Sequence, residues 1–189
     1  MNHDDVENFL DKLFTSSPIA EVVAFSAFLG SVASRIGADV CFESTKSSEY
    51  TEANKRLTRI QLQLEHYERR FSELSEIFSK ISAGIDFDKN LPGNEKAGQI
   101  LELFIDFQKH NNEIISMLRT VAEYSLPQFK TVVVAAVNSV QSAAENITFI
   151  LNGLSVHFEK KEFYKNGVKR NSMLYEDILK LVEQAKKLL

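Results

Sequence analysis

Tryptophan is absent from this chain of 189 residues, and Cys41 is its only cysteine. A single thiol excludes an intrachain disulfide, so a reducing compartment is the simple interpretation. Only 3 prolines and 7 glycines occur, which leaves few of the turns that a sheet protein needs. The scarce residues therefore favour a helical protein, and its aromatic packing depends on 14 phenylalanines.

Neither sign of charge dominates, since the formal net charge is −4. Duplex nucleic acid is not expected as the main partner, because phosphate binding needs a concentrated basic face. The first residues are acidic, and no basic stretch precedes an apolar run, which argues against a Sec-type signal peptide. We expect a cytoplasmic protein, with export without a cleaved signal, or association with a membrane, as the alternatives.

The chain is rich in heptad periodicity, which is clearest from Tyr50 to Ile81. Apolar residues there alternate spacings of three and four, which is the a/d pattern of helices that pack lengthwise. Such a seam cannot face water and must lie against other helices. The seam residues that we expect to form an interaction surface are Tyr50, Leu57, Leu64, Tyr67, Phe71 and Phe78.

The same heptad spacing recurs in residues 95–124 and 128–158, so the pattern predicts a bundle rather than a lone two-stranded coiled coil. We predict an all-α fold: an elongated up-and-down bundle of five or six helices with heptad, coiled-coil-like packing. The length of 189 residues suits a single domain with one core. The expected helices are 4–14, 18–40, 49–82, 95–124, 128–158 and 172–188.

Two of these helices, 18–40 and 131–158, are apolar around most of their circumference, which indicates either the centre of a bundle or a membrane. The first exceeds the roughly 20 residues that span a bilayer, whereas Glu145 and several amides make the second a poor span. We favour central bundle helices. The alternative is a membrane-active bundle, which resembles α-helical pore-forming toxins in outline. The residues expected to contact a membrane are Phe25, Phe28 and Leu29.

No catalytic, cofactor-binding or metal-binding motif occurs in the sequence. The four histidines stand in separate segments, and none follows a glutamate by three residues, as bundle metal sites require. No nucleophile elbow, phosphate loop or dinucleotide fingerprint is present, and Cys41 is expected to be a small structural residue. We therefore expect no enzyme, no cofactor and no metal. The histidines are His3, His66, His110 and His157.

Asn111 interrupts the heptad pattern of the 95–124 helix. A buried amide in such a seam lowers stability but fixes the register or the partner of the helix. The other interpretation places Asn111 at a solvated edge, where it has no such role.

Residues 159–170 are expected to be a connection with a turn at Gly167, followed by a last helix that Asn171 or Ser172 caps. Its basic side chains outnumber its acids, so the segment could contact phosphates or anionic lipid. We favour a solvated loop, because useful polybasic segments are denser. The basic residues are Lys160, Lys161, Lys165, Lys169 and Arg170.

Three functional hypotheses follow. The leading one is a non-enzymatic interaction or scaffold protein that acts through helix–helix contacts, with a protein partner or a second copy of the chain. The second is the membrane-active bundle. The third is a ligand-binding or enzymatic bundle with a polar site between helices, which an ordered polar cluster near Asn111, His66 or His110 would support.

Overall fold

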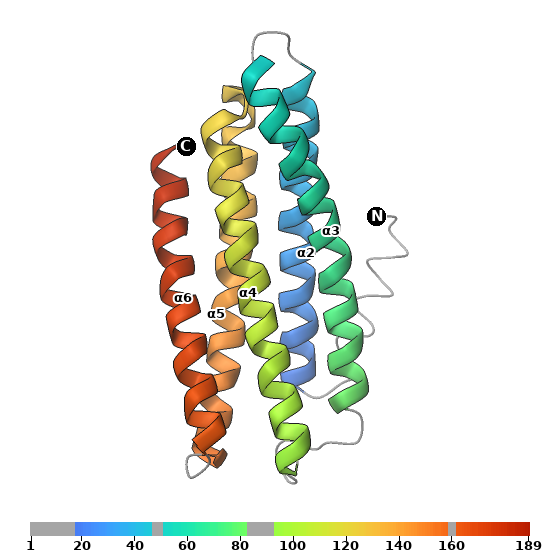
Figure 1. Cartoon of the computed structure of the whole chain (residues 1–189), viewed down its shortest axis with the longest axis vertical. Coiled ribbons are helices and arrows are strands. Elements are labelled where there is room, and N and C mark those ends of the chain that lie inside the picture. Colours follow the sequence, from blue (N-terminus) through green and yellow to red (C-terminus); the bar gives the residue numbers. More distant parts are fainter. Residues whose placement is uncertain (1–17, 47–50, 83–92, 159–161) are drawn as a thin grey trace.

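The computed structural model describes residues 18–46, 51–82, 93–158 and 162–189 (Figure 1). The predicted helix 4–14 and the seam residue Tyr50 lie outside these ranges. Within them the chain is helical and contains no strand, which confirms the prediction of an all-α, up-and-down bundle. The elements are α2 (Pro18–Thr45), α3 (Thr51–Ser82), α4 (Asn94–Tyr124), the 3-10 turn η2 (Pro127–Phe129), α5 (Lys130–Phe158) and α6 (Glu162–Lys187).

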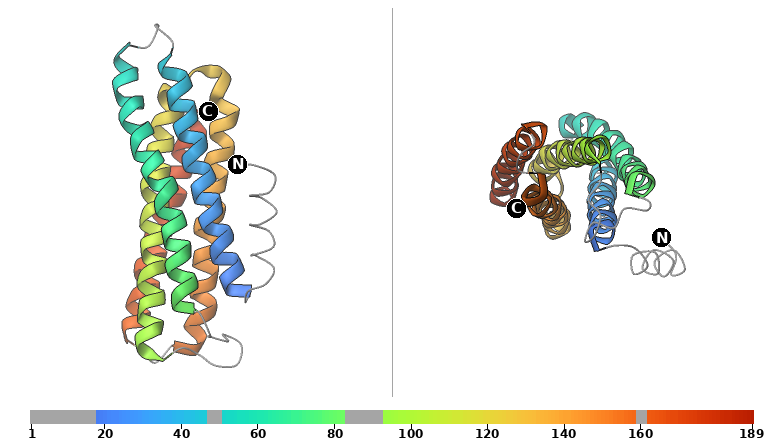
Figure 2. Two further views of the ribbon diagram at one scale, coloured as in Figure 1. Left: turned by 90° about the vertical axis from the view of Figure 1, so that its right-hand side faces the viewer. Right: turned by 90° about the horizontal axis from the view of Figure 1, so that it is seen from below.

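The helices form two layers, with α3, α4 and α6 in front and α2 and α5 behind in the view of Figure 1. The view along the bundle in Figure 2 shows α4 between α3 and α6. α4 packs against each of the other four described α-helices, so it is the central helix. The two apolar helices, one of which we expected at the centre, form the back layer instead. α2 packs against α3, α5 and, less extensively, α4, and α5 packs against α2, α4 and α6.

α2 and α3 pack closely because small residues on α2 lie under large ones on α3. A methyl group added to Gly30 would come within 2.6 Å of the Phe71 ring, and one added to Gly37 within 2.8 Å of Leu64. The buried Ser34 hydroxyl donates a hydrogen bond of 2.8 Å to the Gly30 carbonyl, so no polar group is stranded at this contact. The small residues that the sequence placed along this helix thus permit the close approach.

α6 begins at Glu162, so the predicted connection over 159–170 is wrong for its described part. Gly167 does not mark a turn, because it lies buried within the helix with Leu101 of α4 directly above it. Asn171 is likewise no cap and lies fully buried in the middle of α6. Gly167 lacks a side chain, and Leu101 packs into the space that this leaves. Local turn propensity gives no sign of such a packing role. α2 also continues past residue 40, to Thr45.

Candidate functional site

The heptad seam of α3 lies inside the bundle. Leu57, Leu64, Phe71 and Phe78 are each at most 2% exposed, and Tyr67 is half-buried. The chain's own helices α2 and α4 cover the described part of the seam, so these side chains are not presented to a second chain. Association of this seam with another protein stays a prediction.

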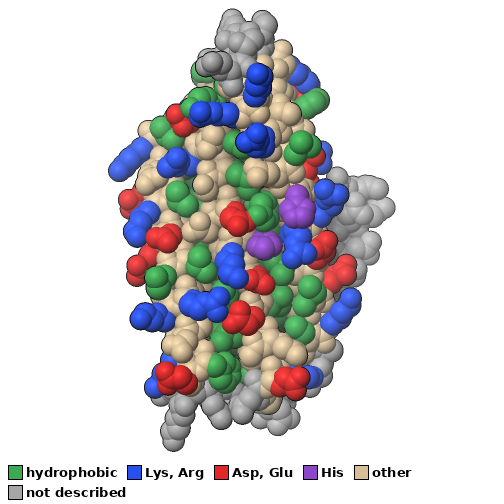
Figure 3. All heavy atoms as spheres, in the orientation of Figure 1, with side chains coloured by type: hydrophobic (Ala, Val, Ile, Leu, Met, Phe, Trp, Pro, Cys, Tyr) green, Lys and Arg blue, Asp and Glu red, His purple; other side chains and the backbone are tan. Residues whose placement is uncertain are grey.

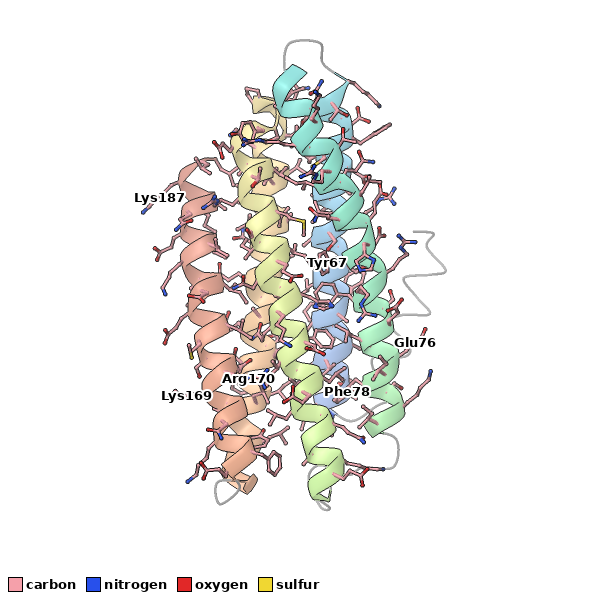
Figure 4. All side chains as sticks on the ribbon, viewed as in Figure 1. Tyr67, Glu76, Phe78, Lys169, Arg170 and Lys187 are labelled. Atoms are coloured by element: carbon pink, nitrogen blue, oxygen red, sulfur yellow. The ribbon has the colours of Figure 1, made fainter. Side chains whose placement is uncertain are left out.

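Polar groups meet at the outer edge of this seam, where α3 and α4 pack together. We call Tyr67 of α3 with His110 and Glu113 of α4 the α3–α4 cluster, and the exposed His66 of α3 lies at its edge. The Tyr67 ring stands edge-on to both histidines, with centroid distances of 5.6 Å to His66 and 5.2 Å to His110. Histidine side chains lie close together on the face drawn in Figure 3, and Figure 4 labels Tyr67 between α3 and α4.

His110 is held as a neutral imidazole. Burial lowers its pKa, and the positive charge of Arg70 lowers it further, as do His66 and Lys109, while Asp106 acts in the opposite direction. Its ring packs against Phe71 at a centroid distance of 6.1 Å, and its buried Nδ1 atom has no hydrogen-bond partner. A buried nitrogen of this kind costs about 1–3 kcal/mol. The site therefore holds an imidazole with one hydrogen-bonding position unused.

Tyr67 and Glu113 form the second half of the cluster. The phenolic hydroxyl of Tyr67 donates a hydrogen bond to Oε2 of Glu113, across the α3–α4 contact. Burial raises the pKa of Glu113. The carboxyl group holds its proton more readily and is hydrogen-bonded to a phenol whose ring packs against a neutral imidazole. General acid–base sites are built from this chemistry.

A separate polar group lies in the interior, where α4, α5 and α6 meet. Nε2 of Gln108 donates hydrogen bonds to the Ala144 carbonyl at 2.8 Å and to Oγ1 of Thr148 at 2.9 Å. Nδ2 of Asn171 also donates to Oγ1 of Thr148, at 3.2 Å. Gln108, Asn111, Thr148 and Asn171 thus form an amide layer across three helices.

The amide layer answers the question about Asn111, which is fully buried and not at a solvated edge. Nδ2 of Asn111 lies 3.4 Å from Oε1 of Gln108, whereas the amide oxygens of Asn111 and Asn171 have no hydrogen-bond partner. Because Gln108 of α4 and Asn171 of α6 both donate to Thr148 of α5, the layer ties three neighbouring helices at one height. The arrangement of these side chains is typical of a buried polar layer that fixes the register of the helices. It is less typical of a reactive centre.

Neither a metal centre nor an activated thiol is formed by the described part of the chain. No group of three histidine, cysteine or acidic side chains lies together there as a metal site would require. Cys41 is fully buried on α2, and burial raises its pKa to about 12, so its thiol is not a nucleophile near neutral pH.

The residues predicted to contact a membrane lie in the first half of α2. Phe25 is 44% exposed, and Phe28 and Leu29 are half-buried. Among the described residues, α2 is the one helix with the length and apolar composition of a membrane span, and one third (33%) of its most apolar window is buried. By those criteria α5 does not qualify.

The described basic residues of the 159–170 segment lie on the exposed surface of α6. Figure 4 labels Lys169 and Arg170 on that helix. Arg170 forms a 3.2 Å ion pair with Glu102 of α4, so part of this charge is already neutralised. Lys165 and Lys169 are exposed, and Lys160 and Lys161 lie outside the described residues.

The sequence did not mark Glu113, Gln108 or Thr148 as site residues, and it marked Asn171 only as a possible helix cap. One signal was available for Asn171: continuing the last apolar stripe backwards by heptads from Ile178 reaches Asn171 and then Tyr164, both of which are buried. Gln108 stands one position from the seam residue Phe107, where it reads as a flanking polar residue. Glu113 carries no signal, because its role depends on the height at which α3 meets α4.

The fold itself has a known counterpart. The chain is similar to the crystal structure of formiminotetrahydrofolate cyclodeaminase from Thermotoga maritima, with a TM-score of 0.79 and 15% sequence identity. The match covers 97% of this chain and 94% of that one. No protein-family model and no curated protein matches the sequence. At 15% identity the likeness shows a shared fold.

This comparison corrects the leading functional hypothesis. We expected a non-enzymatic scaffold because the helices are long and no catalytic motif is present, but a bundle of this architecture and nearly the same extent is an enzyme. The inference failed because motifs are local in sequence, whereas a site between helices combines residues that are far apart in the chain. Long helices without a motif are thus no evidence for a pure scaffold.

Proposed function

We propose that this protein binds a small polar molecule at the α3–α4 cluster and transfers a proton to or from it. The observation that supports the proposal is the meeting of a neutral imidazole, a phenol and a carboxyl group of raised pKa on two facing helices. Perturbed titratable groups that converge in this way are enriched at functional sites. The enzyme fold of the structural neighbour favours catalysis over simple storage or support.

His110 is the proposed base. Its lowered pKa leaves the ring unprotonated near neutral pH and able to accept a proton. The ring lies between Tyr67 and Phe71, and these contacts hold it in one orientation.

Tyr67 and Glu113 form the proposed acid. The Tyr67 hydroxyl donates to Oε2 of Glu113 and fixes the carboxyl group, so a proton on the other carboxyl oxygen, Oε1, can be given to a bound molecule. An acid and a base that share one edge of a bundle can act on the same substrate atom or on adjacent ones. The side chains around them are mixed in charge, with Arg70 paired to Glu73 and Lys109 paired to Asp106.

The name of the neighbour suggests the first molecule to test. It describes removal of an amino group from formiminotetrahydrofolate with ring closure. A nitrogen leaves as ammonia only after it gains protons, which a site with a paired acid and base can supply. Formiminotetrahydrofolate is therefore the substrate that we propose to test first.

The test measures ammonia release from formiminotetrahydrofolate by the full chain. We expect turnover, and we expect His110→Gln and Glu113→Gln to reduce kcat by about 100-fold or more, in line with the usual contribution of general acid–base catalysis. Tyr67→Phe should lower kcat while leaving KM nearly unchanged. Circular dichroism of each variant establishes that the helices are intact.

His66→Gln is the matched control, because His66 touches the same tyrosine but is exposed and outside the proposed proton path. It should retain activity within a few-fold. NMR of the imidazole resonances gives a second readout, in which the His110 signals should move when the substrate is added. An inactive chain whose His110 signals stay unchanged at millimolar substrate would refute the proposal.

A further inference from the structure

The edge at which α3 meets α4 continues beyond the α3–α4 cluster to a second polar contact, between Arg56 of α3 and Tyr124 of α4. Nη1 of Arg56 donates a hydrogen bond of 3.0 Å to the Tyr124 hydroxyl. The guanidinium carbon also lies 5.4 Å from the centroid of the tyrosine ring. These two contacts orient the guanidinium group at the surface of the bundle, where the Arg56 side chain is exposed.

The Arg56–Tyr124 contact and the cluster belong to one antiparallel register of the two helices. Arg56 stands 11 residues before Tyr67 on α3, and Tyr124 stands 11 residues after Glu113 on α4. Eleven residues are close to three full turns of 3.6 residues, so both contacts lie on the same side of the helix pair. At 1.5 Å per residue they are about 16 Å apart along the bundle.

Between these two contacts the edge carries uncharged side chains. The same register places Gln63 of α3 opposite Met117 of α4, and Ile60 opposite Thr120. Met117 is half-buried against the core, and Gln63 is exposed. The edge therefore has titratable groups at one end, an uncharged middle and an arginine at the other end.

The Arg56 end of the edge is basic. Lys55, Arg56 and Arg59 stand within two turns of α3, and all three are exposed. None of the three forms an ion pair with a described acidic side chain. Glu52 and Glu123 are the acids nearby in the sequence, so basic residues are in excess, and Figure 3 shows Lys and Arg side chains gathered at this end of the bundle. At the cluster end, by contrast, the nearby basic residues are paired with acids.

We propose that the α3–α4 edge binds an elongated molecule whose carboxylate lies at the end away from the reacting group, and that Arg56 binds this carboxylate. A guanidinium group presents five N–H donors in a planar fork, so the bond to Tyr124 leaves donors for both oxygens of a carboxylate. The proposal rests on the proposed function, because it takes the cluster as the reacting end. Folates belong to this class of molecule, since their ring system and their glutamate carboxylates stand at opposite ends of an uncharged aminobenzoyl arm.

The experiment measures binding of folate to the full chain by isothermal titration calorimetry. Folate lacks the formimino group, so binding is measured without turnover. We expect folate to bind and Arg56→Gln to weaken its binding by roughly 10-fold or more, because a hydrogen-bonded charge pair is lost. Arg56→Lys should recover part of this loss, since lysine keeps the charge but not the fork. Pteroate, which is folate without its glutamate, should bind the wild type and Arg56→Gln equally.

Arg69→Gln is the matched control. Arg69 is an exposed arginine on the same helix and is nearer to the cluster along the chain, but its position 13 residues after Arg56 turns it about 140° away from the edge. This variant should bind folate as the wild type does. Folate affinity that Arg56→Gln leaves unchanged, or that Arg69→Gln lowers equally, would overturn the proposal, and so would the absence of folate binding at millimolar concentration.

The carboxylate site and the proposed proton transfer fail in different ways. If folate binds through Arg56 but formiminotetrahydrofolate releases no ammonia, the proton transfer is refuted and the carboxylate site is supported. If ammonia is released with a KM that Arg56→Gln does not change, the carboxylate site is refuted and the proton transfer is supported.

Discussion

Two glycines within helices have opposite surroundings, and a methyl group should affect them in opposite directions. Gly30→Ala places a carbon 2.6 Å from the Phe71 ring, which is itself fixed against Phe107. The overpacking cost of about 1–3 kcal/mol should exceed the gain in helix propensity of up to about 1 kcal/mol. At Gly153 no heavy atom lies within 4 Å of the added carbon. Gly153→Ala should therefore stabilise the protein by about 0.5–1 kcal/mol.

Urea unfolding followed by circular dichroism measures both changes. The free energy of unfolding should fall for Gly30→Ala and rise for Gly153→Ala. Phe71→Leu in the Gly30→Ala background should restore part of the loss, because it shortens the side chain that the methyl group meets. A stable Gly30→Ala protein would mean that α2 and α3 can move apart at no cost.

His110 should make stability depend on pH. Its pKa is lowered below 6.5 in the folded protein, so below about pH 6.5 the unfolded chain binds more protons than the native one. The free energy of unfolding should therefore fall as the pH drops from 7.5 to 5.5. His110→Gln should flatten this dependence, and His66→Gln, at the exposed neighbouring histidine, should leave most of it in place.

Glu113 should change the free energy of unfolding with pH in the opposite direction. Because burial raises its pKa above 4.5, the native state holds this proton at higher pH than the unfolded chain does. Its contribution to stability is complete below pH 4.5 and is lost as the pH rises through the folded-state pKa. Glu113→Gln, measured in a series extended below pH 4.5, separates the two residues. An unchanged stability profile in both variants would contradict a perturbed pair.

At the scale of the helices, the amide layer should be the polar feature most sensitive to mutation. Thr148→Val removes the acceptor that Gln108 and Asn171 share, and it leaves the buried Asn171 amide without its hydrogen bond. We expect a loss of about 1–3 kcal/mol in the free energy of unfolding. Thr58→Val is the control, because Thr58 is exposed and its hydroxyl donates to the carbonyl of Asn54 within α3. Its effect should stay within about 0.5 kcal/mol, and equal losses at the two sites would contradict this assignment.

The sequence predicted helix boundaries correctly where the heptad pattern ended at a helix-breaking residue such as proline. α4 ends at Tyr124, ahead of Leu126-Pro127 as predicted, and the seam of α3 runs to Phe78 without a slip. The prediction failed at Gly167. A glycine can either form a turn or leave room for a side chain of another helix, and here it leaves room for Leu101. Sequence spacing does not distinguish them, because the decision rests with a residue of another helix.

The candidate site was harder to predict, for a related reason. Asn111, His66 and His110 were marked as polar residues near seams, but Gln108, Glu113 and Thr148, which complete the two polar groups, were not. Each pairing joins two helices or depends on a neighbour that is held by another helix. The heptad pattern predicts which face of each helix is buried. It does not determine the axial register of one helix against the next.

For the whole molecule, the single thiol offers a measure of opening. Cys41 is fully buried, and burial raises its pKa to about 12, so a thiol reagent at pH 8 should react only when the bundle opens around α2. Labelling should be slow in native buffer, and its urea midpoint should coincide with the loss of helical signal. Fast labelling of the native protein would show that α2 separates from the bundle on its own.

The contact between α2 and α3 has one more consequence, for the way in which the hairpin is assembled. Gly30 and Gly37 lie one heptad apart, as do Phe71 and Leu64 above them. If α3 slid one heptad toward the start of α2, Phe71 would meet Val23 and the slide would be blocked. A slide the other way would place Phe71 opposite Gly37 and Leu64 opposite Ser44, which are both small residues. Misaligned pairing is therefore possible in one direction, and a refolding chain would have to reverse that slip before α4 can close the core.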